Sequence, residues 1–293
     1  MLIGVDFTSS VIKAGIVEGG EVTRSMTADT PANVEPPEVI DTIARVVLAL
    51  APKPAAVGIA IPGEVNTDGR CWRLPNTRGF EGVRIAEEAA RRIRCPIAVE
   101  NRATAAALAE QLYGHGRVQQ NFVLMTLDTG IGGGLVIGHA LYPGSNGFGA
   151  EIGHICVDTT PEAPLCSCGQ RGCVEAFAGT RGVLRKFQEL GGRASDLSAV
   201  ANSARRGEYA GLTAFEAMGR AIGRSLATVQ NFLDLSAIVF SGSSSAYFDL
   251  LEPFVRQELR ARTFAPPLAE VPLLLSSLGD NAAVIGAAHL TTL

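Results

Sequence analysis

The sequence of 293 residues lacks features that would assign it to several classes of protein. Its formal net charge of −4 gives no electrostatic case for binding nucleic acid or an anionic membrane. No apolar run reaches the ~20 residues that a membrane-spanning helix needs. Residues 1–6 lack the basic region and following apolar stretch of a signal peptide. We therefore expect a cytoplasmic protein with neither nucleic acid nor membrane as a partner.

The composition indicates a globular chain with a large core. Hydrophobic residues make up 47% of the sequence and charged residues 18%. The length suffices for two domains of ordinary size. Apolar patterning predicts buried strands at 2–5 and 12–18 and helices at 35–50 and 212–232.

One stretch carries a set of metal-ligand types: His154, Cys166, Cys168 and Cys173. Thiolate and imidazole are ligands that tetrahedral Zn²⁺ prefers, and four protein ligands close its shell. Gly169 and Gly172 lie inside the run, where a chain wrapping a metal needs positive φ. We interpret the four as one structural zinc site. Two alternatives are a pair of buried free thiols with a core histidine, and a disulfide, although nothing marks an oxidising compartment.

Two acidic residues, Glu151 and Glu175, flank this stretch. A metal knot that fixes a loop also fixes the carboxylates at its ends, so the zinc would support a neighbouring ligand site. We therefore expect a binding site next to the metal.

The runs G-A-E-I-G-H (149–154) and C-S-C-G-Q-R-G-C-V-E (166–175) closely resemble the signature of the ROK family, the bacterial sugar kinases and repressors of the actin-like ATPase superfamily. The resemblance extends over residues 3–288. It implies an α/β fold of two actin-like, ribonuclease-H-like domains with an interdomain cleft. It also implies a small N-terminal domain, 1–114, completed by a C-terminal helix at 280–293, and a large domain, 115–279, that holds the zinc motif. ROK proteins are commonly homodimers, so we expect one here.

The resemblance further implies a site for a hexose or N-acetylhexosamine. The residues at the family's sugar-binding positions are Gly63, Asn76, Asn101, Glu151, His154 and Glu175. Gly63 ends the run G-I-A-I-P-G, and Asn76 follows a proline. Taken singly, each short motif also suits a simple turn, but their order along the chain follows that of the family.

ATP-Mg²⁺ is the cosubstrate that the resemblance implies. The residues at the corresponding positions are Thr8, Ser10, Thr129, Gly130, Gly132, Gly133 and Gly242. The first loop departs from the usual D-x-G-G-T because Thr8, Ser9 and Ser10 follow Asp6 and Phe7. Side chains at 8 and 9 obstruct a close approach of phosphate to the backbone, although hydroxyls can still donate. Asp6 is expected either to orient Mg²⁺ through water or only to cap a turn.

A glycine-rich run, 128–134, resembles the family's second phosphate loop, G-T-G-x-G-G-G. Asp128 replaces the first glycine and brings negative charge towards the phosphates unless metal or Arg102 offsets it. The run Ser241-Gly-Ser-Ser-Ser245 stands where ROK kinases often have a glycine pair near the adenosine.

The most informative departure is Arg102. Family kinases read N-D-A-N-A-A-A where this chain reads N-R-A-T-A-A-A, and their aspartate takes the proton from the attacking sugar hydroxyl. A guanidinium has no lone pair for that task. We expect Arg102 to pair with Glu100, Glu151 or Asp128.

Two functions follow as alternatives. One is a sugar-binding, kinase-like protein whose ATP-dependent phosphorylation is weak or lost, with Arg102 and Asp6 at the catalytic positions. The other is an active kinase that transfers the γ-phosphate of ATP to the primary hydroxyl of glucose or an N-acetylhexosamine. We do not expect a ROK repressor, since those carry a helix-turn-helix module ahead of a first strand that here begins at Leu2.

Overall fold

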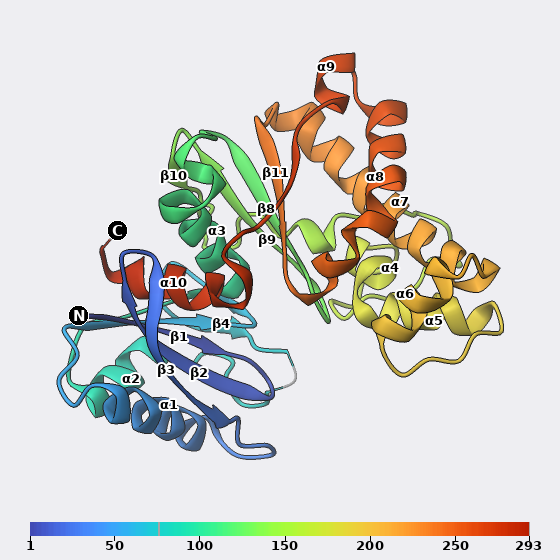
Figure 1. Ribbon diagram of the computed structural model, residues 1–293. Coiled ribbons are helices and arrows are strands. Elements are labelled where there is room, and N and C mark those ends of the chain that lie inside the picture. Colours follow the sequence, from blue (N-terminus) through green and yellow to red (C-terminus); the bar gives the residue numbers. More distant parts are fainter. Residues whose placement is uncertain (76, 293) are drawn as a thin grey trace. The chain divides into compact units, whose positions relative to one another are not determined.

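The computed structural model describes residues 1–75 and 77–292, and it shows an α/β architecture built on two five-stranded sheets (Figure 1). Contacts divide the chain into two units. The first comprises 1–121, 134–150 and the segment from 276 onward; the second comprises 122–133 and 151–275. The chain thus returns to its first unit at the C-terminal end.

The sheet of the first unit has the order β3–β2–β1–β4–β7. Its strands are β1 (Leu2–Phe7), β2 (Val11–Glu18), β3 (Glu21–Asp29), β4 (Ala56–Ile61) and β7 (Ile97–Asn101). β1, β4 and β7 are parallel, and β2 and β3 are antiparallel to their neighbours. The carboxyl ends of β1, β4 and β7 therefore meet at one edge of the sheet.

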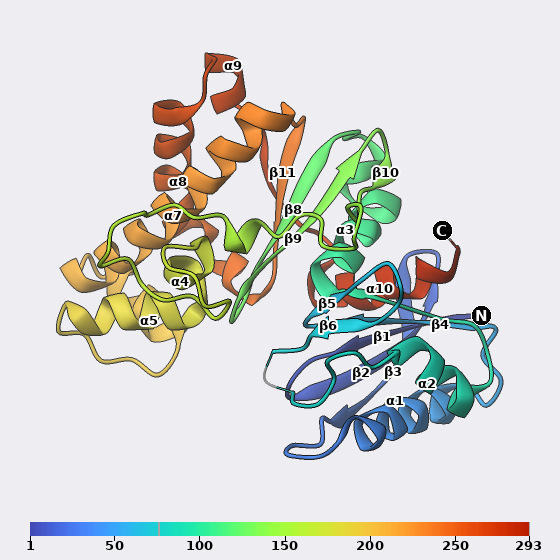
Figure 2. The same cartoon turned by 180° about the vertical axis from the view of Figure 1, so that it is seen from behind.

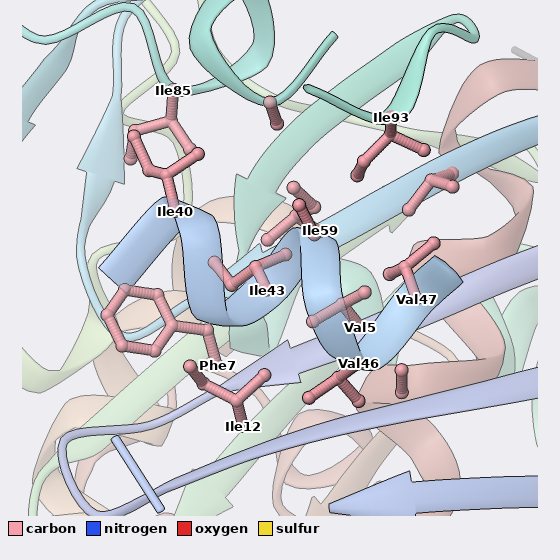
Figure 3. Close-up of a cluster of buried hydrophobic side chains, with 14 of the residues drawn as sticks. Val5, Phe7, Ile12, Ile40, Ile43, Val46, Val47, Ile59, Ile85 and Ile93 are labelled. Atoms are coloured by element: carbon pink, nitrogen blue, oxygen red, sulfur yellow. The ribbon is translucent and has the colours of Figure 1, made fainter. Parts of the chain in front are cut away.

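One face of this sheet is covered by α1 (Pro36–Leu50) and α2 (Ile85–Ile93). Prolines at its first positions suit the start of α1, since their missing N–H would be unpaired there. Figure 3 shows Ile40, Ile43 and Val46 of α1 packed among side chains of the strands, including Val5 and Phe7. Burial of this apolar stripe stabilises the helix on the sheet.

The opposite face is covered by α10 (Ala282–His289), as Figure 2 shows, and the first part of α3 (Arg102–Tyr113) packs there through Ala105. Here helix backbone lies against strand backbone. A Cβ added at Gly58 of β4 would lie 1.6 Å from the carbonyl oxygen of Ala287, and one at Gly4 of β1 would lie 1.8 Å from that of Val284. Glycine is therefore required at both strand positions.

The second sheet has the order β10–β9–β8–β11–β12. Its strands are β8 (Phe122–Leu127), β9 (Ile131–Ile137), β10 (Ala140–Leu141), β11 (Ala237–Ser241) and β12 (Leu273–Leu275), and the boundary between the units falls within β9. The helices of the second unit are α4 (Val174–Ala178), α5 (Thr180–Glu189), α6 (Leu197–Arg205), α7 (Tyr209–Leu233), α8 (Phe248–Arg262) and α9 (Pro266–Ala269). Gly219 and Gly223 let α7 approach α8 closely, since a Cβ at Gly223 would lie 2.8 Å from the carbonyl oxygen of Val255.

A two-stranded sheet of β5 (Glu64–Val65) and β6 (Cys71–Arg73) completes the strands of the first unit. Within the part of the chain that the structure describes, no helix combines the length and apolar character needed to cross a bilayer.

Candidate functional site

Polar side chains gather at the carboxyl edge of the first sheet. Asp6 near the end of β1 pairs in register with Ala60 of β4, and Ala60 pairs with Glu100 of β7. Residues in register on parallel strands point to the same face, so both carboxylates lie on the face that α3 and α10 cover. Asp6 is only 7% exposed, which makes its charge costly unless a partner compensates it.

That partner is Arg102. Nε of Arg102 donates to Oδ1 of Asp6 at 2.5 Å, and Nη2 donates to Oδ2 at 3.0 Å. The pair is bidentate, the geometry for which a guanidinium is shaped. From the sequence we expected Glu100, Glu151 or Asp128 as the partner, and Asp6 was not among these alternatives. Arg102 opens α3 directly after β7, and the sheet order brings this helix start to the end of β1.

Glu100 has an unusual carboxyl group. Burial raises its pKa from 4.5 to about 7, and the N–H of Asn101, which donates to its Oε1 at 2.7 Å, opposes the shift. A carboxyl with this pKa exchanges protons near neutral pH, as a general base must. It stands two residues before Arg102.

Asn101 has a clear structural role. Its Oδ1 caps α3 by accepting from the N–H of Ala103 at 2.8 Å and of Thr104 at 3.4 Å. Its Nδ2 donates to the carbonyl oxygen of Gly63 at 3.1 Å, so the two expected sugar-binding positions of this unit are joined. Asn76 is the third expected sugar-binding residue in this part of the sequence, and it lies outside the described residues.

The turn between β1 and β2 is closed by the hydroxyl of Thr8. Its Oγ1 donates to the carbonyl oxygen of Val11 at 2.8 Å and accepts from the N–H of Val11 at 2.9 Å. The hydroxyl expected to face a phosphate thus serves the turn itself. Ser10 is exposed, and its hydroxyl lies 3.4 Å from that of Thr8.

In the second unit, the four metal-ligand residues come together. The ligand atoms of His154, Cys166, Cys168 and Cys173 all lie within 4.8 Å of one another. A tetrahedral ion with Zn–S of about 2.3 Å and Zn–N of about 2.0–2.1 Å separates its ligands by about 3.5–3.8 Å. The structure has 3.5 Å from Nδ1 of His154 to Sγ of Cys166, and 3.7 Å between Sγ of Cys168 and Cys173. The cluster therefore fits a tetrahedral metal.

Backbone geometry supports this cluster. His154 ends the 3₁₀ turn η2 (Ile152–His154), and Cys173 directly precedes α4. Gly172 has φ of 75°, and a Cβ there would lie 1.7 Å from the carbonyl oxygen of Asp158, so no other residue fits. The six cysteines all lie within the described residues and form no disulfide. Burial is the main cause that raises the pKa of the Cys173 thiol to about 12, and a bound metal would have to displace this proton.

The two flanking carboxylates have different surroundings. Oε2 of Glu151 lies 3.9 Å from Nε2 of His154, the ring nitrogen that does not face Cys166. A carboxylate on the second nitrogen of a ligand histidine fixes its ring and tautomer. Glu175 accepts from the hydroxyl of Ser167 at 2.6 Å and from the N–H of Ile131 at 3.1 Å. It therefore joins the cysteine loop to the turn between β8 and β9.

That turn holds the expected phosphate-binding glycines. The N–H of Gly132 donates to the hydroxyl of Thr126 at 3.1 Å, so it serves the hairpin. A Cβ at Gly130 would lie 2.5 Å from Oε2 of Glu175. Thr129 is exposed and Gly133 is buried.

Asp128 at the start of the turn bonds to the loop after β11. Its Oδ1 accepts from the N–H of Ser243 at 2.8 Å and from the hydroxyl of Ser243 at 2.7 Å. Gly242, with φ of 90°, shapes this loop. Sequence reasoning singled out neither Ser243 nor Ser167 as a partner, since single serines carry no spacing signal.

Comparisons with known proteins agree over nearly the whole chain. The profile of the ROK family matches residues 2–292. A glucokinase from Thermotoga maritima is 30% identical over 307 residues, covering 99% of this chain and 96% of the relative. An N-acetylmannosamine kinase from Escherichia coli is 30% identical over 298 residues, covering 98% of this chain and 97% of the relative. The crystal structure of a ROK family glucokinase from Streptomyces griseus in complex with glucose and AMPPNP has a TM-score of 0.83 at 30% identity, covering 99% of this chain and 98% of that one.

Proposed function

Because the chain belongs to the ROK family and has its actin-like α/β fold, we propose that it binds a hexose or N-acetylhexosamine and phosphorylates it weakly or not at all. The observation that carries the proposal is the bidentate pair of Arg102 and Asp6. Arg102 stands at the family's base position and cannot accept a proton. Asp6, the other catalytic position, has its charge compensated inside the protein.

The loss of a base alone lowers a rate by ~10²–10⁴-fold. Phosphoryl transfer depends mainly on positioning and on neutralising charge. Since Asp6 is bound to Arg102, we infer that its part in orienting Mg²⁺ is weakened as well. Both effects lower the rate while leaving sugar contacts unaffected.

The proposed sugar contacts are the residues at the family's positions: Gly63, Asn76, Asn101, Glu151, His154 and Glu175. Ionised carboxylates can accept from neighbouring hydroxyls of a sugar ring. The relative from Streptomyces griseus was crystallised with glucose and AMPPNP, which supports a sugar and a nucleotide as ligands here. The proposed nucleotide contacts are Thr8, Ser10, Thr129, Gly130, Gly132, Gly133 and Gly242.

We also infer that His154, Cys166, Cys168 and Cys173 hold one structural Zn²⁺. The support is the separation of their ligand atoms. In this arrangement Nδ1 of His154 would bind the metal, and Nε2 lies 3.9 Å from Oε2 of Glu151. A homodimer is proposed from the family resemblance.

A second candidate function, an active kinase, is favoured by Glu100. Its pKa of about 7 suits a general base, and it lies beside Asn101. In this case Glu100 replaces the missing aspartate.

The test is steady-state phosphorylation of glucose, N-acetylglucosamine and N-acetylmannosamine, followed by ADP release, with sugar affinity measured by calorimetry. We expect the wild type to bind one of these sugars and to turn over well below the ordinary range of about 1–10³ s⁻¹. Arg102→Asp should raise the rate by orders of magnitude, because it supplies a base. Arg102→Asn is the matched control, since it frees Asp6 without adding a base.

Three outcomes would distinguish the proposed sugar-binding protein from an active kinase or contradict both. Wild-type turnover within the ordinary range that Glu100→Gln abolishes would establish the active kinase instead. Equal gains in Arg102→Asp and Arg102→Asn would show that releasing Asp6, and not restoring a base, limits the rate. Absence of binding to every sugar at millimolar concentration would overturn the proposed function.

A further inference from the structure

One side chain ties together two loops of the second unit. Asp128 lies in the turn between β8 and β9, and Ser243 lies in the loop after β11. The Asp128 carboxylate accepts two hydrogen bonds from the same residue, from the N–H of Ser243 at 2.8 Å and from its hydroxyl at 2.7 Å. A backbone N–H with an adjacent hydroxyl is the donor set with which proteins bind phosphate oxygens. Here an internal anion occupies it.

The carboxylate is aimed at this position by its own backbone. The carbonyl oxygen of Asp128 accepts from the N–H of Thr180 at 3.3 Å and from its hydroxyl at 3.1 Å, while its N–H donates to the carbonyl oxygen of Gly130 at 3.0 Å. The N–H and the carbonyl oxygen of Asp128 are therefore both hydrogen-bonded, and this fixes the direction in which its side chain points.

The facing loop is shaped to present its donors. Gly242 has φ of 90°, and a Cβ at this position would lie 2.6 Å from the carbonyl oxygen of Leu127 and 2.9 Å from Oδ2 of Asp128. Only glycine allows the two loops to approach this closely. The close approach leaves little room for a second anion beside the carboxylate.

The two residues in contact, Asp128 and Ser243, both differ from the sequence pattern of the family. Asp128 stands where a glycine is usual, and Ser243 stands in a loop that usually holds a glycine pair. Glycine at 128 has no carboxylate to offer, so this hydrogen-bonded pair depends on the aspartate. The two residues are 115 positions apart in the sequence.

We propose that Asp128 determines how weakly the protein binds a nucleoside triphosphate: its carboxylate occupies the donors of Ser243 and repels the phosphate groups of the nucleotide. The inference rests on the proposed function only in that these loops are taken to face the nucleotide. The carboxylate and a phosphate group carry like charges and compete for the same donors, so the bound carboxylate disfavours binding of the phosphate. Nucleotide binds only when the Asp128–Ser243 pair opens.

The experiment measures the affinity of Mg²⁺-AMPPNP and of uncharged adenosine for the full-length wild type and for variants. Asp128→Gly should tighten AMPPNP binding by about 10-fold or more, which corresponds to about 1.4 kcal/mol. Asp128→Asn, which keeps an acceptor and loses the charge, should give a smaller gain. Adenosine affinity should stay the same in both, because only the phosphates meet the carboxylate.

Asp196→Asn is the matched control. Asp196 is an exposed aspartate of the same unit, and its Oδ1 accepts from a backbone N–H, that of Ala199, at 2.9 Å. AMPPNP affinity should not change in this variant. The conservative Asp128→Asn keeps the test valid if Asp128→Gly fails to fold.

Unchanged or weaker AMPPNP binding in folded Asp128→Gly and Asp128→Asn would overturn the inference. An equal gain for adenosine would also overturn it, since that result indicates a general opening of the loops and not relief of charge. Sugar calorimetry on the same proteins separates this inference from the proposed function. Failure of the wild type to bind sugar contradicts the proposed function alone.

Discussion

At the scale of single residues, the chemistry of the first unit is decided by the ionic state of three side chains. Asp6 is buried, and Arg102 compensates its charge through two hydrogen bonds. Glu100 differs, because burial raises its pKa to about 7. It is therefore the carboxyl group of this edge that titrates near neutrality.

Glu100 has a measurable effect on stability. Its pKa is about 7 in the folded protein, against 4.5 for an ordinary glutamate in water, so the folded state binds more protons between these values. Stability is then full below about pH 4.5, falls as pH rises towards about 7, and levels off above. Glu100→Gln removes this loss. Its advantage over the wild type should grow through that window to an upper limit on the order of 3 kcal/mol.

The measurement is denaturant unfolding of both proteins from pH 4.5 to pH 8. Glu87→Gln, at an exposed site on α2, is the control and should follow the wild type at every pH. A constant difference between Glu100→Gln and wild type across the range would mean that the carboxyl does not titrate as described.

At the scale of elements, the cysteine loop and the β8–β9 turn act together. Glu175, two residues after Cys173, accepts from the N–H of Ile131 in the turn. Gly153, next to His154, packs against the same residue, since a Cβ there would lie 2.0 Å from the carbonyl oxygen of Ile131. Ile131 thus contacts neighbours of two proposed metal ligands, on both its N–H and its carbonyl side.

Loss of the metal should therefore loosen the turn. Cys166→Ser is expected to lower bound zinc from one equivalent per chain towards zero and to speed amide hydrogen exchange at Ile131 by 10-fold or more, because Glu175 is no longer fixed. Elemental analysis and exchange measured by mass spectrometry check this. Cys95→Ser, outside the cluster, should change neither. Zinc-free wild type with a fully protected Ile131 amide would contradict both the metal and the coupling.

At the scale of the whole molecule, each unit has a core of its own. In the first, apolar side chains of α1 and the sheet pack on one face, and α10 closes the other through glycine contacts. In the second, α7 packs on α8, and the side chains of His154, Cys166, Cys168 and Cys173 gather next to α4. Although β9 runs through both units, these packing features lie in different units, so local damage should act mainly on the unit that contains it.

Calorimetry should resolve this as two thermal transitions. Gly58→Ala forces a methyl group to 1.6 Å from the carbonyl oxygen of Ala287 and should lower only the transition of the first unit, by at least the 1–3 kcal/mol or so of an overpacked core. A metal chelator should lower only the other transition. Gly69→Ala, at φ of 74° in open space, adds backbone strain alone and should cost about 1 kcal/mol. A single transition that moves with either perturbation would contradict this independence.

The sequence by itself determined the elements whose signal is local. The predicted strands at 2–5 and 12–18 are found as β1 and β2, and the helices at 35–50 and 212–232 as α1 and α7, because apolar periodicity reports burial along one segment. The family and its fold also followed from short motifs, and the four candidate metal-ligand residues, which the structure brings together, lie close in the sequence. β3 was missed, since most of its residues are exposed and show no clean alternation.

Tertiary structure alone decided which groups meet. Arg102 and Asp6 are 96 positions apart, Ser243 and Asp128 are 115 apart, and Glu175 and Ile131 are 44 apart. No periodicity links such pairs; strand order and register bring them together. A charged or hydroxyl side chain shows in the sequence what it can donate or accept, but its partner, and hence whether it stays free for a ligand, depends on the packing of distant elements.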